Sequence, residues 1–166
     1  YANNLEASIN CFLGPLKMQI QLFSTQISNA INREFGTLNG EDSVFYDGEL
    51  MRVQMNKNIE SASINGVSFS GDFTANNNFV ITFSCNYLRG KTKNNTPLAH
   101  IPPFNAKMSL NYQLPRHIFS FYAHHNGWKA AKDYDLAGVD NLEEATIDGS
   151  PSWHTLNLSY TNKIDK

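Results

Sequence analysis

The stretch from Asn78 to Tyr87, NFVITFSCNY, constrains the fold more than any other part of the sequence. Apolar and polar side chains alternate along it, and a period of two is typical of a β-strand with one apolar and one polar face. Such a strand fits a soluble β-sandwich and a membrane-spanning β-barrel equally well. The other strands, and the connections between them, therefore have to distinguish the two folds.

The same alternation recurs along most of the chain. It predicts an all-β fold, an antiparallel up-and-down β-sheet of about seven strands, and no helix. The pattern changes phase at Phe23 and again near Gly66, where we expect a bulge or, at Phe23, an aromatic side chain on the inward face. The expected strands cover roughly residues 5–13, 18–31, 51–73, 78–87, 104–114, 117–128 and 153–161.

The strand at 104–114 has the most regular pattern. Its apolar face begins at Phe104 and includes Leu110, and strands of about ten residues are long enough to cross a bilayer when tilted. Its other face is polar at five consecutive positions, which predicts contact with water along its whole length. In a barrel these would be the lumen-facing residues Asn105, Lys107, Ser109, Asn111 and Gln113.

The connections between the expected strands alternate strictly between short and long. Short turns fall at 14–17, 74–77 and 114–117, and long loops at about 33–50, 89–103 and 129–152. An up-and-down sheet with all its long loops at one end is typical of an outer-membrane β-barrel. Greek-key sandwiches need not keep this regularity.

Composition narrows the classes of function. Only 17% of residues are charged, the net charge is -2, and no basic patch indicates a nucleic-acid partner. No apolar run is long enough for a membrane helix, and no signal peptide opens the chain. Cys11 and Cys85 fall on the apolar phase of their strands, so we expect free thiols rather than a disulfide.

Five stretches of the chain resemble, in the same order, the C-terminal part of the β-barrel of TonB-dependent outer-membrane receptors. Asn58, Ala62, Ile64 and Gly66 match the family pattern N-x-x-x-A-x-I-x-G-x-E, in which Ser68 replaces the usual glutamate. The five stretches are NLEASINCFL, QLFSTQISNAI, NIESASINGVSFS, TPLAHIPPFNAKMSLNYQL and SPSWHTLNLSY.

The resemblance implies a fragment of a larger transmembrane β-barrel. Barrels of this family have about 22 strands around a plugged lumen, so we expect residues 1–166 to be a partial barrel, an excerpt without the plug domain, the TonB box and the terminal strands. It also implies a bacterial outer-membrane location, contact with outer-membrane lipid, and partnership with the plug and, through it, TonB. The implied function is import of a siderophore, a corrinoid or a glycan.

Candidate sites for ligand contact lie in the long loops that the resemblance places outside the cell. The residues expected to face the ligand are Tyr46, Asp47, His100, Trp128, Asp133, Tyr134 and Asp135.

The alternative to a membrane barrel is a small soluble β-barrel or β-sandwich that acts as a binding module. In that fold the apolar face would form the interior and the polar face would meet solvent.

Motifs for catalysis and metal binding are weak. Asp133, Asp135, Gly138 and Glu144 match four positions of an EF-hand calcium loop, but Ala137 replaces a ligand and no helices flank the segment. His124 and His125 are adjacent, so they point to opposite faces of a strand. No nucleophile elbow or glycine-rich phosphate loop occurs. We therefore expect no enzymatic activity, no metal site and no cofactor.

Overall fold

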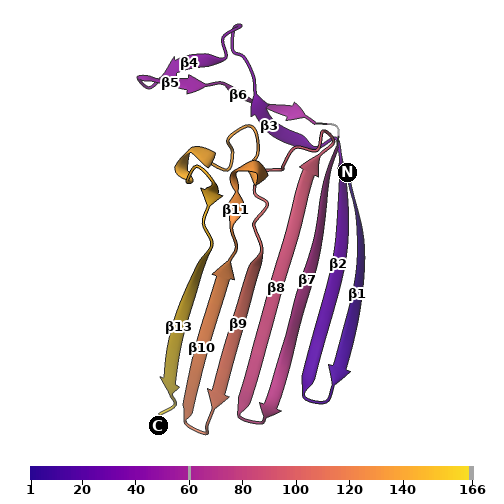
Figure 1. The fold of residues 1–166 in the computed structure, drawn as a ribbon, viewed down its shortest axis with the longest axis vertical. Coiled ribbons are helices and arrows are strands. Elements are labelled where there is room, and N and C mark those ends of the chain that lie inside the picture. Colours follow the sequence, from indigo (N-terminus) through magenta and orange to yellow (C-terminus); the bar gives the residue numbers. More distant parts are fainter. Residues whose placement is uncertain (60, 165–166) are drawn as a thin grey trace.

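The main body of the chain is one antiparallel sheet of seven strands in the order β1-β2-β7-β8-β9-β10-β13 (Figure 1). It is seen in a computed structural model that describes residues 1–59 and 61–164. The order of the strands in the sheet follows their order along the chain, which confirms the predicted all-β, up-and-down fold. The strands are β1 (Ala2–Leu13), β2 (Leu16–Ser28), β7 (Ser61–Asn76), β8 (Phe79–Thr92), β9 (Asn105–Gln113), β10 (His117–Asn126) and β13 (Trp153–Asn162).

The long connections all lie at one end of this sheet and the tight turns at the other, as predicted (Figure 1). At the turn end, Gly14 adopts a φ of 57°, a conformation that glycine reaches without steric cost. The long connections contain the smaller elements β3 (Ile31–Phe35), β4 (Ser43–Tyr46), β5 (Glu49–Arg52), β6 (Gln54–Asn58), β11 (Lys129–Ala130), η1 (Ala131–Asp133), η2 (Leu142–Glu144) and β12 (Gly149–Ser150).

The boundaries of three predicted strands were wrong. The strand expected at 78–87 continues to Thr92 as β8. The strand expected at 18–31 ends at Ser28, because Asn29 turns the chain with a φ of 55°. The strand expected at 51–73 is divided: its first residues belong to β5 and β6, which form hairpins with β4 and β3, and the main strand starts only at Ser61. Met51, Val53 and Met55 alternate across the break between β5 and β6, so the pattern alone does not reveal that break.

The expected bulges at Phe23 and Gly66 are absent, because the pairing of β2 with β7 runs through both positions without a shift. The β7–β8 pairing is also continuous at Gly66 and shifts only between Thr74 and Asn76. Phe23 instead lies opposite Gly66 on the polar face, where a Cβ on the glycine would lie 2.3 Å from the Phe23 Cζ. The second expectation for Phe23, an inward aromatic, is thus confirmed.

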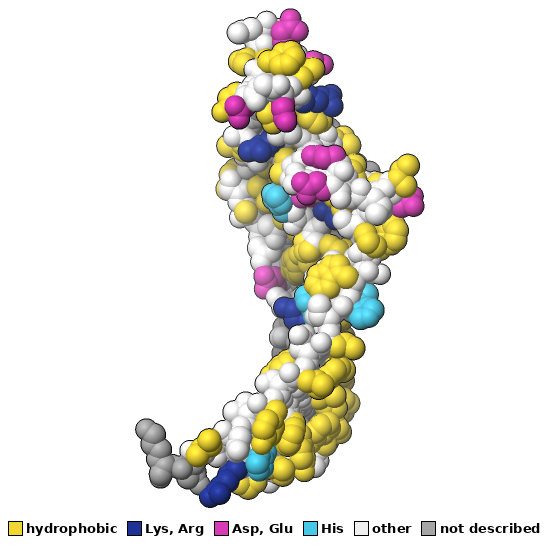
Figure 2. Space-filling model, turned by 90° about the vertical axis from the view of Figure 1, so that its left-hand side faces the viewer, with side chains coloured by type: hydrophobic (Ala, Val, Ile, Leu, Met, Phe, Trp, Pro, Cys, Tyr) yellow, Lys and Arg dark blue, Asp and Glu magenta, His cyan; other side chains and the backbone are white. Residues whose placement is uncertain are grey.

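The sheet is curved, and its apolar side chains lie on the convex side (Figure 2). Leu110 illustrates this face, since its neighbours across the sheet are Ile81 on β8 and Phe121 on β10. In a small soluble barrel the apolar face would be concave, because it fills the interior. The curvature therefore argues against the soluble alternative.

Few of the described apolar side chains are shielded from solvent by the protein itself. Ala62, Tyr134 and Ala137 are the buried hydrophobic residues among them, and all three lie at the loop end or in the loops. On the sheet, Ile9 is 72% exposed and Leu158 is 86% exposed. An apolar surface that extends over seven strands is far larger than the patches of soluble monomers, so it requires a cover.

The two cysteines are free thiols, as expected. Cys11 lies on β1 and Cys85 on β8, and β2 and β7 separate these strands in the sheet. Among the residues that the structure describes, no helix is both long and apolar enough to cross a membrane.

Candidate functional site at the loop end of the sheet

The long connections contact one another above the sheet. The backbone N–H of His100, in the β8–β9 loop, donates a hydrogen bond of 2.8 Å to Asp140 Oδ1 in the β10–β13 loop. Gln54 Nε2, on β6, donates one of 2.5 Å to the carbonyl oxygen of Ala137. All three long connections are thus linked through the β10–β13 loop, which makes it the centre of the candidate site.

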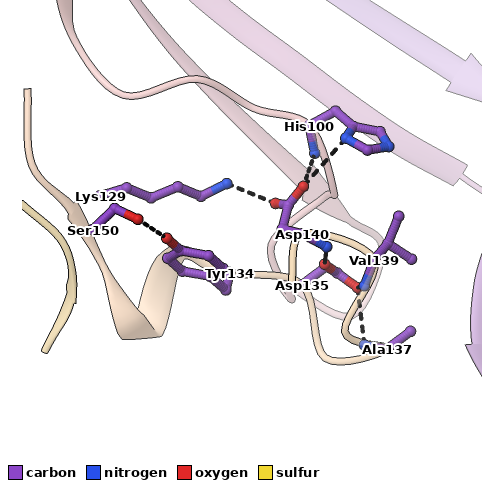
Figure 3. A network of polar contacts seen from close by, with 8 residues as sticks. All are labelled: His100, Lys129, Tyr134, Asp135, Ala137, Val139, Asp140 and Ser150. Atoms are coloured by element: carbon purple, nitrogen blue, oxygen red, sulfur yellow. Dashed lines mark hydrogen bonds and ion pairs between the residues drawn. The ribbon is translucent and has the colours of Figure 1, made fainter. Parts of the chain in front are cut away.

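Asp135 organises this central loop (Figure 3). Its side chain is buried, and its Oδ2 accepts hydrogen bonds from the backbone N–H groups of Ala137, at 3.0 Å, and Val139, at 3.1 Å. Its Oδ1 accepts a third from the N–H of Asp140, at 2.9 Å. A carboxylate that accepts three backbone N–H groups fixes the turn in one conformation.

Asp140 connects the central loop to its neighbours (Figure 3). Lys129 Nζ lies 2.6 Å from Asp140 Oδ2, and His100 Nδ1 lies 3.3 Å from Oδ1. Burial acts to raise the pKa of Asp140, but the hydrogen bonds from Lys129 and the His100 backbone, with the nearby positive charges, lower it below its usual value. Asp140 is therefore ionised in the folded loop.

The lowered pKa of Asp140 predicts how the loop responds to acid. A depressed folded-state pKa stabilises the fold above the unfolded-state pKa of about 3.9, and this stabilisation is lost as the pH falls through the folded-state value. We expect proteolysis of the β10–β13 loop to be unchanged between pH 7 and pH 5 and to accelerate below about pH 4. Asp140→Asn should be cleaved faster at pH 7 and lose most of this acid response; an identical acid response in the variant would contradict the assignment.

Tyr134 and Lys129 close the base of the loop. The Tyr134 hydroxyl lies 2.5 Å from Ser150 Oγ on β12, and Lys129 Nζ lies 4.6 Å from the centre of the Tyr134 ring. β11 and β12 pair through Lys129 with Ser150 and Ala130 with Gly149. The base thus combines a short two-stranded sheet, a hydroxyl contact and a cation–π contact.

Gly149 is required by the close approach of two backbones at this base. Its φ is 110°, and an ideal Cβ would lie 2.1 Å from the carbonyl oxygen of Lys129. We expect Gly149→Ala to separate β11 from β12 and to increase trypsin cleavage after Lys129 and Lys132 in the purified full-length protein. Gly48→Ala is the matched control, because its φ is 86° but no atom lies within 4 Å of its ideal Cβ. Equal cleavage of both variants would contradict the proposed clash.

The structure divides the predicted ligand-facing residues into three groups. Tyr46 and Asp47 are exposed at the turn of the outermost β4–β5 hairpin. His100, Trp128 and Asp133 are exposed around the central loop. Tyr134 and Asp135 are instead buried within that loop, with their polar atoms in hydrogen bonds inside it. Their contribution to a site is to hold its shape.

A hollow of about 510 Å³ lies beside the upper part of β8, where β8 extends beyond its pairing with β9. Trp128 and Asp133, from the predicted set, line it. Sequence reasoning missed Arg89 and Lys91 because the charged residues at these positions interrupt the apolar alternation and the predicted strand ended at Tyr87. Lys129 and Lys132 lie in the β10–β13 connection, where no sequence pattern distinguished them. The four cations that line the hollow are Arg89, Lys91, Lys129 and Lys132.

The concave face of the sheet carries a network of polar side chains. Asn105, Lys107, Ser109, Asn111 and Gln113, predicted to face a lumen, share this face. Ser120 Oγ donates a hydrogen bond of 2.8 Å to Asn111 Oδ1, and Asn86 Nδ2 donates one of 3.2 Å to Asn105 Oδ1. The polar groups of this wall are therefore partly satisfied by one another, and the rest are available to water or to a polar partner.

The weak metal motifs do not converge on a site. Within residues 1–59 and 61–164, no three or more His, Cys, Asp or Glu side chains gather in a way that could hold a metal ion. In the EF-hand-like segment, three backbone N–H groups occupy the carboxylate of Asp135. His124 pairs with Lys107 and His125 with Ala106, so the two imidazoles lie on opposite faces of the sheet.

Comparisons with known proteins give a consistent family and fold. A family model described as TonB dependent receptor-like, beta-barrel matches residues 1–165. Among solved structures, the copper transporter OprC is similar with a TM-score of 0.75 and 14% identity, over 99% of this chain and 23% of OprC. The ferric enterobactin receptor PfeA of Pseudomonas aeruginosa is similar with a TM-score of 0.73 and 16% identity, over 99% of this chain and 24% of PfeA.

The siderophore receptor PirA of Acinetobacter baumannii is also similar, with a TM-score of 0.70 and 15% identity, over 99% of this chain and 26% of PirA. The chain thus spans about a quarter of the length of these structures. A search of curated protein sequences gave no significant match.

Proposed function

This chain belongs to the family of TonB-dependent receptor-like β-barrels, and from that membership we propose that it forms part of the wall and external loops of an outer-membrane receptor. The receptor would import a scarce ligand, such as a ferric siderophore, a corrinoid or a glycan, with energy delivered through TonB. No catalytic step is required of this chain, because its contribution is a wall, a lumenal surface and a set of loops.

The observation that carries this proposal is the position of the apolar face on the convex side of the curved sheet (Figure 2). Lipid surrounds a transmembrane barrel from outside, so its outer surface must be apolar, while its interior can be polar. The sheet meets both conditions. Its β1 and β13 are the edge strands, and in the proposed receptor further strands would pair with them to close the barrel.

The polar concave face suits contact with a plug domain or with water in the lumen. Lys107 and Asn111 stand among uncharged polar groups on this face, where they can exchange hydrogen bonds with a second polar surface. We propose that Asn105, Lys107, Ser109, Asn111 and Gln113 form part of the wall against which the plug packs. Rearrangement of the plug, driven by TonB, would then open the path for the ligand.

The loops that cluster beyond the sheet are the proposed site of ligand capture. Tyr46 and Asp47 are exposed at the turn of the β4–β5 hairpin, which lies beyond the loop end of the sheet, and His100, Trp128 and Asp133 are exposed around the central loop. These exposed side chains are the proposed ligand contacts. The hydrogen bonds of Asp135 and Asp140 hold the central loop in one conformation, which lowers the conformational entropy cost of ligand binding.

Fractionation of source cells tests the proposed function. An antibody raised against this chain should detect a protein several times heavier than 18.7 kDa in the outer-membrane fraction. Deletion of its gene and loss of TonB should abolish accumulation of the same ligand when labelled siderophores, corrinoids and glycans are offered in turn. A band of about 18.7 kDa among soluble proteins would contradict the proposal.

A further inference from the structure

On β2, β7 and β8 the convex face changes from apolar to polar at one level near the loop end, whereas the edge strand β1 has Leu5 beside Ser24 in the polar row. Neighbouring positions on β2, β7 and β8 form rows across the sheet, and the change occurs between two consecutive rows of this face. The last apolar row consists of Leu22, Val67 and Tyr87, and the next row consists of Ser24, Asn65 and Arg89. This change marks the level at which the hydrocarbon of a surrounding membrane would end.

Arg89 and Lys91 follow Tyr87 on the same face of β8. A strand rises about 3.4 Å per residue, so these two cations lie roughly 7 and 14 Å along the strand beyond the apolar boundary. The headgroup layer of a bilayer occupies a zone roughly 5–8 Å thick on each side of the hydrocarbon. Arg89 is therefore placed at the depth of the lipid headgroups, and Lys91 lies beyond them.

The hollow beside β8 concentrates positive charge at this depth. Lys129 is paired with Asp140 at 2.6 Å. Among the described residues, the one polar contact of Lys91 Nζ is with the neutral side-chain oxygen of Asn95, and Lys132 and Arg89 have no ion pair. Three cations that are not neutralised by Asp140 therefore share the hollow with a single carboxylate, Asp133. The hollow is complementary to an anion.

An apolar groove of about 480 Å³ continues from this hollow along the convex face. Phe104 lines both the hollow and the groove, which makes the two spaces adjacent. Most of the residues that line the groove belong to the convex face, His125 and His154 among them, and the ring centres of Phe69 and Phe83 lie 5.4 Å apart within it. A molecule that fits both spaces has an anionic head and an apolar tail.

We propose that the hollow and the groove together bind a phosphorylated lipid of the outer leaflet. The guanidinium of Arg89 and the ammonium of Lys132 bind the phosphate of its headgroup, because both groups donate charge-assisted hydrogen bonds to phosphate oxygens. Tyr87 and Trp128 line the hollow as aromatic residues of the interface. An acyl chain lies in the groove below Phe104. This inference rests on the outer-membrane location proposed above.

Lipid binding by the purified full-length receptor tests this inference. Native mass spectrometry after incubation with diphosphorylated lipid A should show a bound lipid, and the variant Arg89→Gln/Lys132→Gln should retain it at least about tenfold less. Lys17→Gln, a lysine at the turn end of β2, is the control and should bind like the wild type. Fully dephosphorylated lipid A should bind the wild-type receptor at least about tenfold more weakly than the diphosphorylated form. This comparison tests the role of the phosphate without any change to the protein.

Two results would overturn the inference. Equal retention of phosphorylated and dephosphorylated lipid A would remove the role of the phosphate. Displacement of the lipid by equimolar inorganic phosphate would show that the hollow serves a soluble anion. Failure of the proposed function is distinguished by fractionation, since a receptor that lies in the outer membrane without retaining lipid contradicts only the lipid site.

Discussion

Replacing Leu110 with arginine is expected to remove most of the folded receptor from the outer membrane. Leu110 lies on the convex face between Ile81 and Phe121, inside the apolar band. An arginine on the lipid face of a barrel costs about 2 to 4 kcal/mol at the midplane of the bilayer. The amount of receptor in the outer membrane, and its heat-modifiable migration on gels, would measure the loss.

Ser109→Arg is the matched control for Leu110→Arg, because Ser109 is the adjacent residue and points to the opposite face. Its neighbours across the sheet are Thr82 and Tyr122 on the polar concave side. An arginine there meets water and polar groups, so we expect nearly normal assembly. Equal tolerance of both changes, or greater damage from Ser109→Arg, would contradict the assignment of the two faces.

Replacing Asp135 with alanine is expected to loosen the central loop without affecting the sheet. The change removes three hydrogen bonds to backbone N–H groups, at 2.9, 3.0 and 3.1 Å. Hydrogen bonds to a charged group contribute about 1.5 to 3 kcal/mol each, so the free energy of local opening should fall by at least about 3 kcal/mol. Amide hydrogen exchange in residues 136–140 should accelerate by at least about a hundredfold.

Asp135→Asn provides a graded comparison. Its amide keeps one acceptor oxygen, so it can retain the bonds made by one carboxylate oxygen and lose those made by the other. We expect exchange rates in residues 136–140 between those of the wild type and Asp135→Ala, with the amides of β9 unchanged in both variants. Wild-type exchange in Asp135→Ala would contradict the role of this carboxylate.

The alternation of side chains was sufficient to predict the seven strands of the sheet, because each strand contacts two different environments. The pattern misled near Phe23 and Gly66, where an unbroken register contains a phase change. Here the strands extend past the apolar band of the convex face, and a small cluster of apolar side chains forms on the inward face. Leu98 and Ile101 of the β8–β9 loop approach Gly90 on this side. A change in the environment of a strand and a bulge both produce the same phase change in the apolar pattern of the sequence.

The curvature of the sheet could not be predicted from the pattern. A transmembrane barrel and a soluble barrel have the same alternation, and they differ only in which face is concave. The alternation of short and long connections and the family resemblance favoured the membrane barrel. The bend of the sheet provides the independent physical evidence, since it places Leu110 outside and Asn111 inside.

The candidate site was predictable only as a region. The long loops indicated which end of the sheet carries it, but the contacts within it join residues that no sequence pattern relates. His100 and Asp140 are 40 residues apart and belong to different loops. Tyr134 and Asp135 were selected for their chemistry, yet burial gives them a structural role. Arg89 was missed because the predicted strand ended at Tyr87, five residues before the end of β8 at Thr92.

The assignment of the convex face to lipid is tested most directly by spin labels on two adjacent residues of β9. In full-length receptor in which Cys11 and Cys85 are replaced by serine, a nitroxide would be attached to Leu110→Cys or to Asn111→Cys. The label at 110 should be accessible to oxygen, which concentrates in the bilayer, and shielded from a water-soluble nickel complex, whereas the label at 111 should be shielded from oxygen. The reverse pattern, with the label at 110 open to the nickel complex, would show that the polar face meets lipid and would contradict the account.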